Sequence, residues 1–272
     1  MDALTTLAWL VEAGADEAIA DAPVNRLTAK PSAPALTPAT PPPVPIKPRG
    51  PASLPLVQTV SGDAIGDAMK AASAARDLDA LKAAMEAFEG SALKRAATNT
   101  VFADGTPSGR VMFIGEAPGR DEDRIGKPFV GRAGQLLDKM LASIDLDRSR
   151  NCYITNVINW RPPDNRDPSP EEAAICLPFL RRHIELANPG IIVLLGAVAA
   201  RHVMGVTEGI MKTRGRWLEY RVGDVMVPVM PTLHPAYLLR QPAHKKLAWR
   251  DLQAVASRME ALGLPEPSVR GS

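Results

Sequence analysis

Cysteine is scarce in this sequence, and its scarcity bounds the type of protein. The 272 residues include two cysteines, Cys152 and Cys176. Two cysteines give no disulfide framework of the kind that stabilises small secreted domains. Because disulfides are rare in the cytosol, low cysteine content fits that compartment. We therefore expect a cytoplasmic protein.

Long apolar runs and a strong charge excess are also missing. No run approaches the roughly 18 apolar residues that a membrane span needs, and Met1–Leu4 lacks the basic start of a signal peptide. The formal net charge of +2 indicates no partner by itself, because a protein that binds single strands or one damaged base needs only a local basic groove. A groove of this kind, or alternatively a solvated helix face, is predicted from Arg240, His244, Lys245, Lys246 and Arg250.

Proline is abundant but unevenly placed. About eleven of the 26 prolines lie between Ala22 and Ser61, so this stretch is expected to be a flexible tether. Before it, Leu4–Ala20 has apolar residues at helical spacing. This short helix could bind a protein partner, or residues 1–60 could be dispensable disorder. We expect residues 61–264 to form the folded domain and residues 265–272 a disordered tail.

The rest of the chain alternates strands and helices. One long Ala-rich helix is predicted from Ser61 to about Glu89. From Arg110 onward, apolar runs alternate with helical patterns, which implies a parallel sheet covered by helices on both faces. Arg216–Tyr220 and Val225–Pro228 are expected to form a hairpin-like pair. The expected strands are Val111–Ile114, Tyr153–Thr155, Ile191–Leu195 and Val225–Val229, and the expected helices are Ala133–Ile144, Pro170–Ala187, Ala197–Val203 and Lys245–Leu262.

The most informative segment is Gly115–Asp123. It breaks the first strand and delivers two carboxylates, Glu116 and Glu122, to the strand end, where ligands bind in open α/β sheets. A glycine loop at this place can also hold phosphate. Here no Lys-Ser/Thr pair follows and the acidic side chains would repel phosphate. Solvated loop charge is the other interpretation, mainly for Asp121 and Asp123.

An aromatic, an amide and an imidazole follow at similar places. Phe129 lies in the Gly-rich segment Gly126–Gly134. Asn156 ends the second strand, and its amide can donate and accept at once, which suits the edge of a nucleobase, although turn asparagines are common. His234 follows the last strand on a loop stiffened by Pro235, so we interpret it as functional. The histidines on predicted helices are interpreted as structural, namely His183, His202 and His244.

These motifs, in their order and spacing, resemble the family 4 uracil-DNA glycosylases. They are Gly115–Gly119 with Glu122–Asp123, Pro128–Gly134, Ile154–Asn156, Arg161–Arg166 and His234–Arg240. The resemblance covers about Ser91 to Leu262. It implies a three-layer α/β/α sandwich with a central, mostly parallel four-stranded sheet. It also implies a DNA repair enzyme that flips uracil out of DNA and hydrolyses its N-glycosidic bond, leaving an abasic site.

The resemblance also assigns roles to single residues. Phe129 stacks on the extruded uracil beside Ala117, Asn156 reads its N3–H and O4, and His234 donates to O2 as charge builds there. A carboxylate, Glu122 in preference to Glu116, stabilises the cationic sugar, and Asn165 positions water. The remaining family matches are expected to contact DNA, with the apolar ones wedging into the gap or packing in the core: Arg161, Arg166, Tyr237, Leu238, Leu239 and Arg240.

The sequence departs from the family at its cofactor. Members usually hold a four-iron, four-sulfur cluster through four cysteines, and a cluster needs these thiolates. Here Cys176 is the one match, while Phe88, Ser91 and Trp160 stand at the other positions. We therefore expect no cofactor and no metal, with aromatic packing in place of the cluster. A related branch that traps DNA covalently carries a basic insertion, which is missing after Asn165, so ordinary turnover is expected.

Two other functions remain open from the sequence. One is a non-catalytic uracil- or DNA-binding module of the same fold, which would read a base without cutting. The other is a small-molecule hydrolase, because fold does not fix function. The expected partner under the main hypothesis is uracil-containing DNA, bound by a monomer with no membrane association.

Overall fold

The computed structural model describes residues 62–264. Within them, one six-stranded sheet has the order β1-β3-β2-β4-β6-β5, and its four inner strands are parallel. The expected sheet of four strands was therefore too small, because antiparallel strands are added at both edges. The strands are β1 (Asp104–Gly105), β2 (Val111–Gly115), β3 (Tyr153–Asn156), β4 (Ile191–Leu195), β5 (Leu218–Val222) and β6 (Val225–Thr232).

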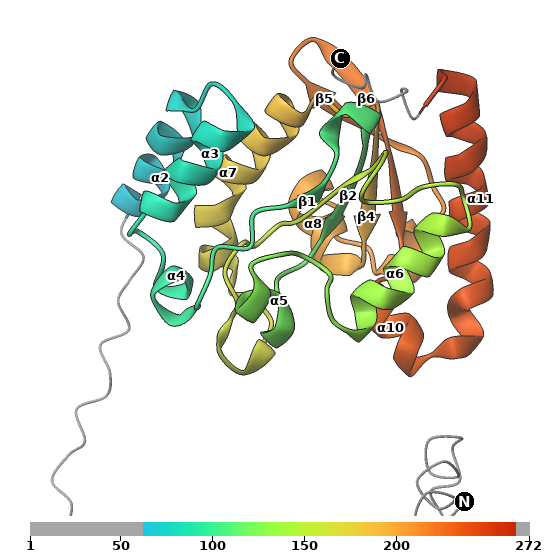
Figure 1. The fold of residues 1–272 in the computed structure, drawn as a ribbon, viewed down its shortest axis with the longest axis horizontal. Helices are drawn as coiled ribbons and strands as arrows, with labels where there is room; N and C mark the ends of the chain where they lie inside the picture. Colours follow the sequence, from blue (N-terminus) through green and yellow to red (C-terminus); the bar gives the residue numbers. More distant parts are fainter. Residues whose placement is uncertain (1–61, 265–272) are drawn as a thin grey trace, which may run out of the picture. The chain divides into compact units, whose positions relative to one another are not determined.

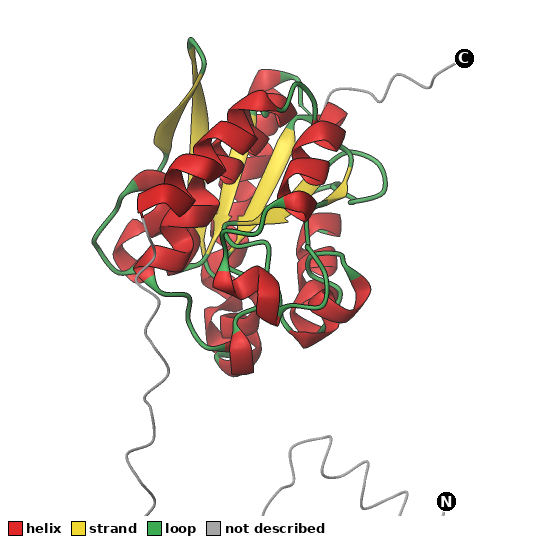
Figure 2. Cartoon of the chain, turned by 90° about the vertical axis from the view of Figure 1, so that its left-hand side faces the viewer, coloured by secondary structure: helices red, strands yellow, loops and turns green. Residues whose placement is uncertain are grey.

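Helices cover both faces of the sheet, which confirms the three-layer sandwich (Figures 1 and 2). Alternate strand residues face opposite sides, as a pleated strand requires. Met112 and Ile114 belong to one core together with α2, α3 and α7, whereas Val111 and Phe113 belong to a second core together with α6 and α11. The helices are α2 (Gly62–Ala74), α3 (Leu78–Ala87), α4 (Ala92–Ala96), α5 (Arg120–Ile125), α6 (Arg132–Ala142), α7 (Pro170–Ala187), α8 (Ala197–Met204), α9 (Ile210–Thr213), α10 (Pro235–Arg240) and α11 (Lys245–Leu262).

The single long helix expected up to Glu89 is wrong. The chain forms α2 and α3 instead, separated by a short break. Asp77 causes the restart, because it has an extended backbone and its carboxylate accepts a hydrogen bond from the Ala80 amide at 2.7 Å. A side chain that caps a helix N-terminus in this way favours a new helix over continuation of the old one. The expected helix Leu4–Ala20 and the tether lie outside the described residues.

The carboxyl ends of the parallel strands meet at one edge of the sheet, beside α5 and α10 at the bottom of Figure 1. Gly115 and Asn156 are register partners there. The β5–β6 hairpin, which the sequence predicted, projects at the opposite end of the sheet. Among the described helices, none is both long enough and apolar enough to cross a membrane.

Candidate active site

A cavity of about 470 Å³ opens at the carboxyl ends of β2, β3 and β6. It brings together residues from motifs that are more than a hundred positions apart in the sequence. All residues predicted for catalysis or base binding line it: Glu116, Ala117, Glu122, Phe129, Asn156, Asn165 and His234. Of the predicted DNA contacts, Arg166, Tyr237 and Arg240 also reach it. The strand ends therefore create one site, as open α/β sheets do.

Asn156 presents an unpaired amide oxygen in this site. The side chain is 2 % exposed, and its Oδ1 has no hydrogen-bond partner among the described residues. Buried polar atoms are nearly always paired, so this oxygen is available to accept a hydrogen bond from an N–H group of a ligand. Gly115 makes the arrangement possible, because a Cβ there would lie 2.4 Å from Oδ1 and 2.5 Å from the Phe129 ring.

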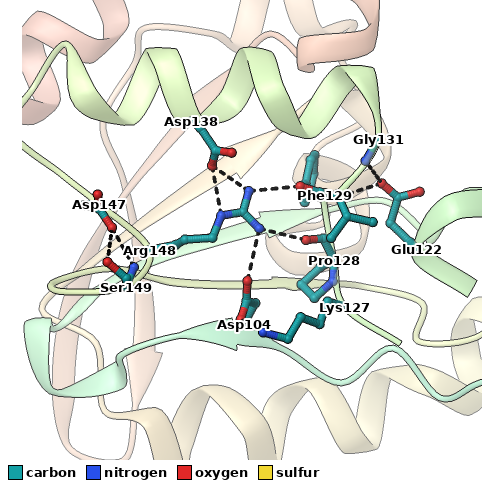
Figure 3. A network of polar contacts seen from close by, with 11 residues as sticks. Asp104, Glu122, Lys127, Pro128, Phe129, Gly131, Asp138, Asp147, Arg148 and Ser149 are labelled. Atoms are coloured by element: carbon teal, nitrogen blue, oxygen red, sulfur yellow. Dashed lines mark hydrogen bonds and ion pairs between the residues drawn. The ribbon is translucent and has the colours of Figure 1, made fainter. Parts of the chain in front are cut away.

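Phe129 adopts a backbone conformation that is rare for a residue with a side chain. Its φ is +54°, which costs energy unless neighbours hold it. Two charged side chains do so (Figure 3). The guanidinium of Arg148 donates to the carbonyl oxygens of Pro128 and Phe129 at 3.0 and 2.9 Å. Arg148 is in turn held by Asp104 and Asp138.

Glu122 holds the same loop from the other side. Its Oε1 accepts from the amides of Val130 and Gly131 at 2.9 and 3.0 Å, and its Oε2 accepts from the Gly119 amide at 3.1 Å. Both carboxylate oxygens are thus occupied by the backbone. The sequence expectation that preferred this residue as the catalytic carboxylate did not foresee this structural use.

Glu116 has a different environment. Its side chain makes no hydrogen bond or ion pair with the described residues. Burial raises the pKa of this carboxyl above its ordinary value, and the nearby carboxylate of Asp167 raises it further, while Arg201 opposes the shift. A half-buried carboxylate without a partner stabilises positive charge that appears beside it, since local screening is weak.

His234 has a defined tautomer. Its Nδ1 accepts a hydrogen bond from the Ala236 amide at 3.1 Å, so the proton of the neutral ring is on Nε2. Burial lowers the pKa of His234 to about 4, with a smaller contribution from Arg240, and the ring is neutral at pH 7. Gly196, with φ +95°, allows close approach, because a Cβ there would be 3.0 Å from that of His234. The ring centroids of His234 and Phe129 are 5.5 Å apart.

The predicted DNA contacts are only partly accessible. Leu238 is 1 % exposed and packs in the core, so its expected wedge role is corrected: its helix α10 turns it toward α6 and α11. Leu239 is 38 % exposed. The hydroxyl of Tyr237 is bonded to His244 Nδ1 at 2.7 Å, and Arg166 is paired with both carboxylate oxygens of Glu172.

The four cluster positions do not fit an iron–sulfur cluster. The rings of Phe88 and Trp160 are stacked with centroids 6.3 Å apart, and Phe179 packs edge-on against both, at 5.2 and 6.4 Å. Cys176 is buried in this same core, whereas Cys152 lies in the core on the other face of the sheet. Among the described residues no group of three or more His, Cys, Asp or Glu side chains could hold a metal ion.

Comparison with known proteins agrees with this geometry. A sequence model of the uracil DNA glycosylase superfamily matches residues 102–253, more than half of the chain. The Type-4 uracil-DNA glycosylase of Thermotoga maritima is 41 % identical over 169 residues, which are 61 % of this chain and 86 % of that protein. The Archaeoglobus fulgidus Type-4 uracil-DNA glycosylase is 39 % identical over 181 residues, 65 % of this chain and 89 % of that protein. The Type-5 uracil-DNA glycosylase of Pyrobaculum aerophilum is 34 % identical over 116 residues, 38 % of this chain and 51 % of that protein.

The fold and the site thus define a member of the uracil DNA glycosylase superfamily. Within the superfamily, the chain belongs to the type-4 group.

Sequence reasoning did not find the residues that hold the Phe129 loop in place. Arg148 stands in Asp147–Asn151, which has the composition of a charged surface turn, and only the fold brings it to the Phe129 loop.

Proposed function

We propose that this chain excises uracil from DNA by hydrolysing the N-glycosidic bond and leaves an abasic site. The observation that carries the proposal is Asn156 Oδ1, which has no hydrogen-bond partner among the described residues and lies in a cavity beside Phe129. Uracil offers an N3–H donor to that oxygen and an O4 acceptor to the amide nitrogen. Cytosine presents the reverse pattern, so it would leave buried groups unpaired at about 1–3 kcal/mol each. The base must leave the stack to enter the cavity.

Departure of the base places negative charge on uracil. His234 supports it by donating from Nε2 to the uracil O2, with the Ala236 amide fixing the tautomer. A neutral imidazole is suited to this role, because its Nε2–H donates a hydrogen bond to O2 while the proton stays on the ring. Such preorganised donors are typically worth about 2.7–4 kcal/mol in the transition state.

The sugar becomes cationic as the bond breaks, and Glu116 is the carboxylate that meets it. Its oxygens have no partner among the described residues, whereas those of Glu122 are held by three amides. We therefore assign Glu116 to charge stabilisation and to orienting water, and Glu122 to positioning the Phe129 loop. Water supplies hydroxide to C1′ and a proton to the departing uracil, which balances the hydrolysis.

The protein works without an iron–sulfur cluster under this proposal, as a cytoplasmic monomer whose partner is uracil-containing DNA. The stacked Phe88 and Trp160 support the first point, because they place aromatic rings in a buried core at two of the positions where the family has cysteine ligands. The segment after Asn165 reaches α7 without an insertion, which supports ordinary turnover. A protein partner for residues 1–60 remains a separate proposal.

The test is incubation of purified protein with a uracil-containing oligonucleotide, single- or double-stranded, followed by alkali. We expect a strand break at the uracil and none in a thymine control. Binding without cleavage would instead support the non-catalytic module. Hydrolysis of small esters or amides without any action on DNA would support the small-molecule hydrolase.

A further inference from the structure

A second cavity, of about 540 Å³, adjoins the active site. The two cavities share Glu122, Ala133 and Asn165 in their linings. Three arginines line the second cavity: Arg120 and Arg132, which begin α5 and α6, and Arg161, which follows β3. Sequence reasoning had selected only the last of these as a DNA contact. The fold therefore gathers three guanidinium groups from distant segments beside the site of base binding.

Arg120 and Arg132 are exposed and Arg161 is half-buried, so their charged groups can be reached from solvent. Arg148, Arg182 and Arg214 are each paired with a carboxylate. By contrast, Arg120, Arg132 and Arg161 form no ion pair within 4.0 Å among the described residues, and Arg161 bonds only to the amide oxygen of Asn165, at 2.7 Å.

The cavity lining also carries three carboxylates, and none of them lies within 4.0 Å of these three guanidinium groups. Glu122 is engaged by backbone amides. Asp121 lies 4.0 Å from Arg124, which is outside the lining. Asp164 remains as the third acidic group. Because none of the three guanidinium groups is in an ion pair among the described residues, all three are available to an anionic ligand.

We propose that this arginine cavity binds backbone phosphates of the DNA strand next to the flipped nucleotide. The inference rests on the proposed function. The planar guanidinium fork matches phosphate oxygens with two parallel hydrogen bonds. Because the cavity shares its wall with the uracil pocket, a phosphate of the same strand reaches it once the base is inserted. Each contact adds affinity and orientation without reading sequence.

The experiment measures how DNA affinity depends on salt. The probe is a single-stranded oligonucleotide with a non-hydrolysable 2′-fluoro-deoxyuridine, and its Kd is determined in a series of sodium chloride concentrations. Each lost phosphate contact lowers the slope of log affinity against log salt by about 0.7 for single strands. The double variant Arg120→Gln/Arg132→Gln should therefore bind more weakly and lose about 1.4 from the slope.

Two control variants distinguish the loss of phosphate contacts in the arginine cavity from a general loss of positive charge. Arg221→Gln removes a positive charge from β5, at the far end of the sheet, and should keep the native slope. Arg120→Lys/Arg132→Lys should keep most of the slope, because charge rather than the fork sets counterion release. A slope of the Gln double variant equal to that of native protein, with an unchanged melting temperature, would overturn the proposal.

A further arm distinguishes DNA phosphate from free phosphate. Inorganic phosphate replaces chloride at constant ionic strength, and DNA affinity is measured again. Weakened binding in native protein but not in the Gln double variant supports the arginine cavity as the common site. Failure of the proposed function itself shows separately, as native protein that leaves no abasic site in the oligonucleotide assay.

Discussion

The guanidinium of Arg148 holds the carbonyl oxygen of Phe129 at 2.9 Å. This contact, with the neighbouring one to Pro128, fixes the peptide that carries the strained φ of +54°. Glu122 fixes the next two amides from the opposite side (Figure 3). The ring that we propose to stack on the extruded base is therefore held through its backbone by two charged side chains. Preorganisation of this kind removes an ordering cost from binding.

Loss of Arg148 should loosen the aromatic platform. Arg148→Gln leaves two carbonyls without a charged donor, and hydrogen bonds to charged groups contribute about 1.5–3 kcal/mol each. We expect single-turnover excision to fall roughly tenfold or more, with a lower melting temperature, as measured by a quenched oligonucleotide assay and thermal unfolding. Arg150→Gln, on the same turn but exposed, is the matched control and should behave as native. Native rates in Arg148→Gln would remove its positioning role.

Substitution of Glu116 and substitution of Glu122 should have different effects on excision rate and stability. Glu116→Gln removes charge from a side chain with no bonded partner among the described residues, so the rate should drop by about 10²-fold or more with little loss of stability. Glu122→Gln keeps one amide oxygen where two carboxylate oxygens accept three N–H groups, so it should lower the melting temperature as well as the rate. Excision rates and melting curves for both variants test the division; stability loss confined to Glu116→Gln would reverse the assignment.

The pKa of Glu116 predicts an acid limit for activity. The group must be ionised to meet a cationic sugar, and burial raises its pKa. The rate should therefore fall as pH drops through a value above the ordinary pKa of a glutamate. Asp167→Asn removes a charge that raises this pKa and should move the limit to lower pH, whereas Arg201→Gln should move it to higher pH. Single-turnover pH profiles measure both shifts, and coincident profiles would exclude Glu116 as the titrating group.

The apolar runs were enough to predict the parallel strands and most long helices, because burial on both sides of the sheet requires them. α7 and α11 begin and end at the predicted residues. The two-residue strand β1 has no apolar run and pairs only because β3 lies beside it. For Leu238 the sequence left a DNA wedge and core packing both open, because its exposure depends on how α10 packs on α6, and the structure selects the core.

The supporting contacts of the site were invisible for a related reason. Arg148 joins Asp104, Pro128 and Asp138, which lie up to 44 residues away from it in the chain. No local pattern marks such a set. The proposed base-binding and catalytic residues could be named from the sequence, because Glu116, Asn156 and His234 each stand at or just after a strand end, where topology alone brings loops together.

The aromatic rings that pack where the family has its cluster cysteines should stabilise the fold. Phe88 contacts both Trp160 and Phe179, and removal of a buried phenyl ring costs about 3–5 kcal/mol. Phe88→Ala should lower the free energy of unfolding by that amount, as measured in urea, while Met69→Ala on the exposed face of α2 should change little. Protein purified without oxygen should be colourless and free of stoichiometric iron. Iron and sulfide in active protein would contradict a cluster-free enzyme.

Stability should also fall on the acid side because of His183. Burial lowers the pKa of this histidine to about 3, and its Nε2 is bonded to the Tyr153 hydroxyl at 2.9 Å. An unfolded histidine titrates near 6.5, so between about pH 6.5 and 3 the unfolded state binds a proton that the folded state refuses. The contribution of neutral His183 to the free energy of unfolding is fully present above that window. It is lost as pH falls, by up to about 1.4 kcal/mol per pH unit.

Urea unfolding at several pH values from 7 downward checks this prediction. His183→Gln removes the titrating group, so its free energy of unfolding should fall less steeply with acid than that of native protein. Tyr153→Phe removes the same hydrogen bond but keeps the imidazole, and its pH dependence should stay close to native. His234, whose pKa is lowered to about 4, contributes equally to native and His183→Gln proteins and cancels from their difference. If the free energy of unfolding fell equally steeply with acid in native and His183→Gln proteins, His183 would bind its proton as readily in the folded as in the unfolded protein.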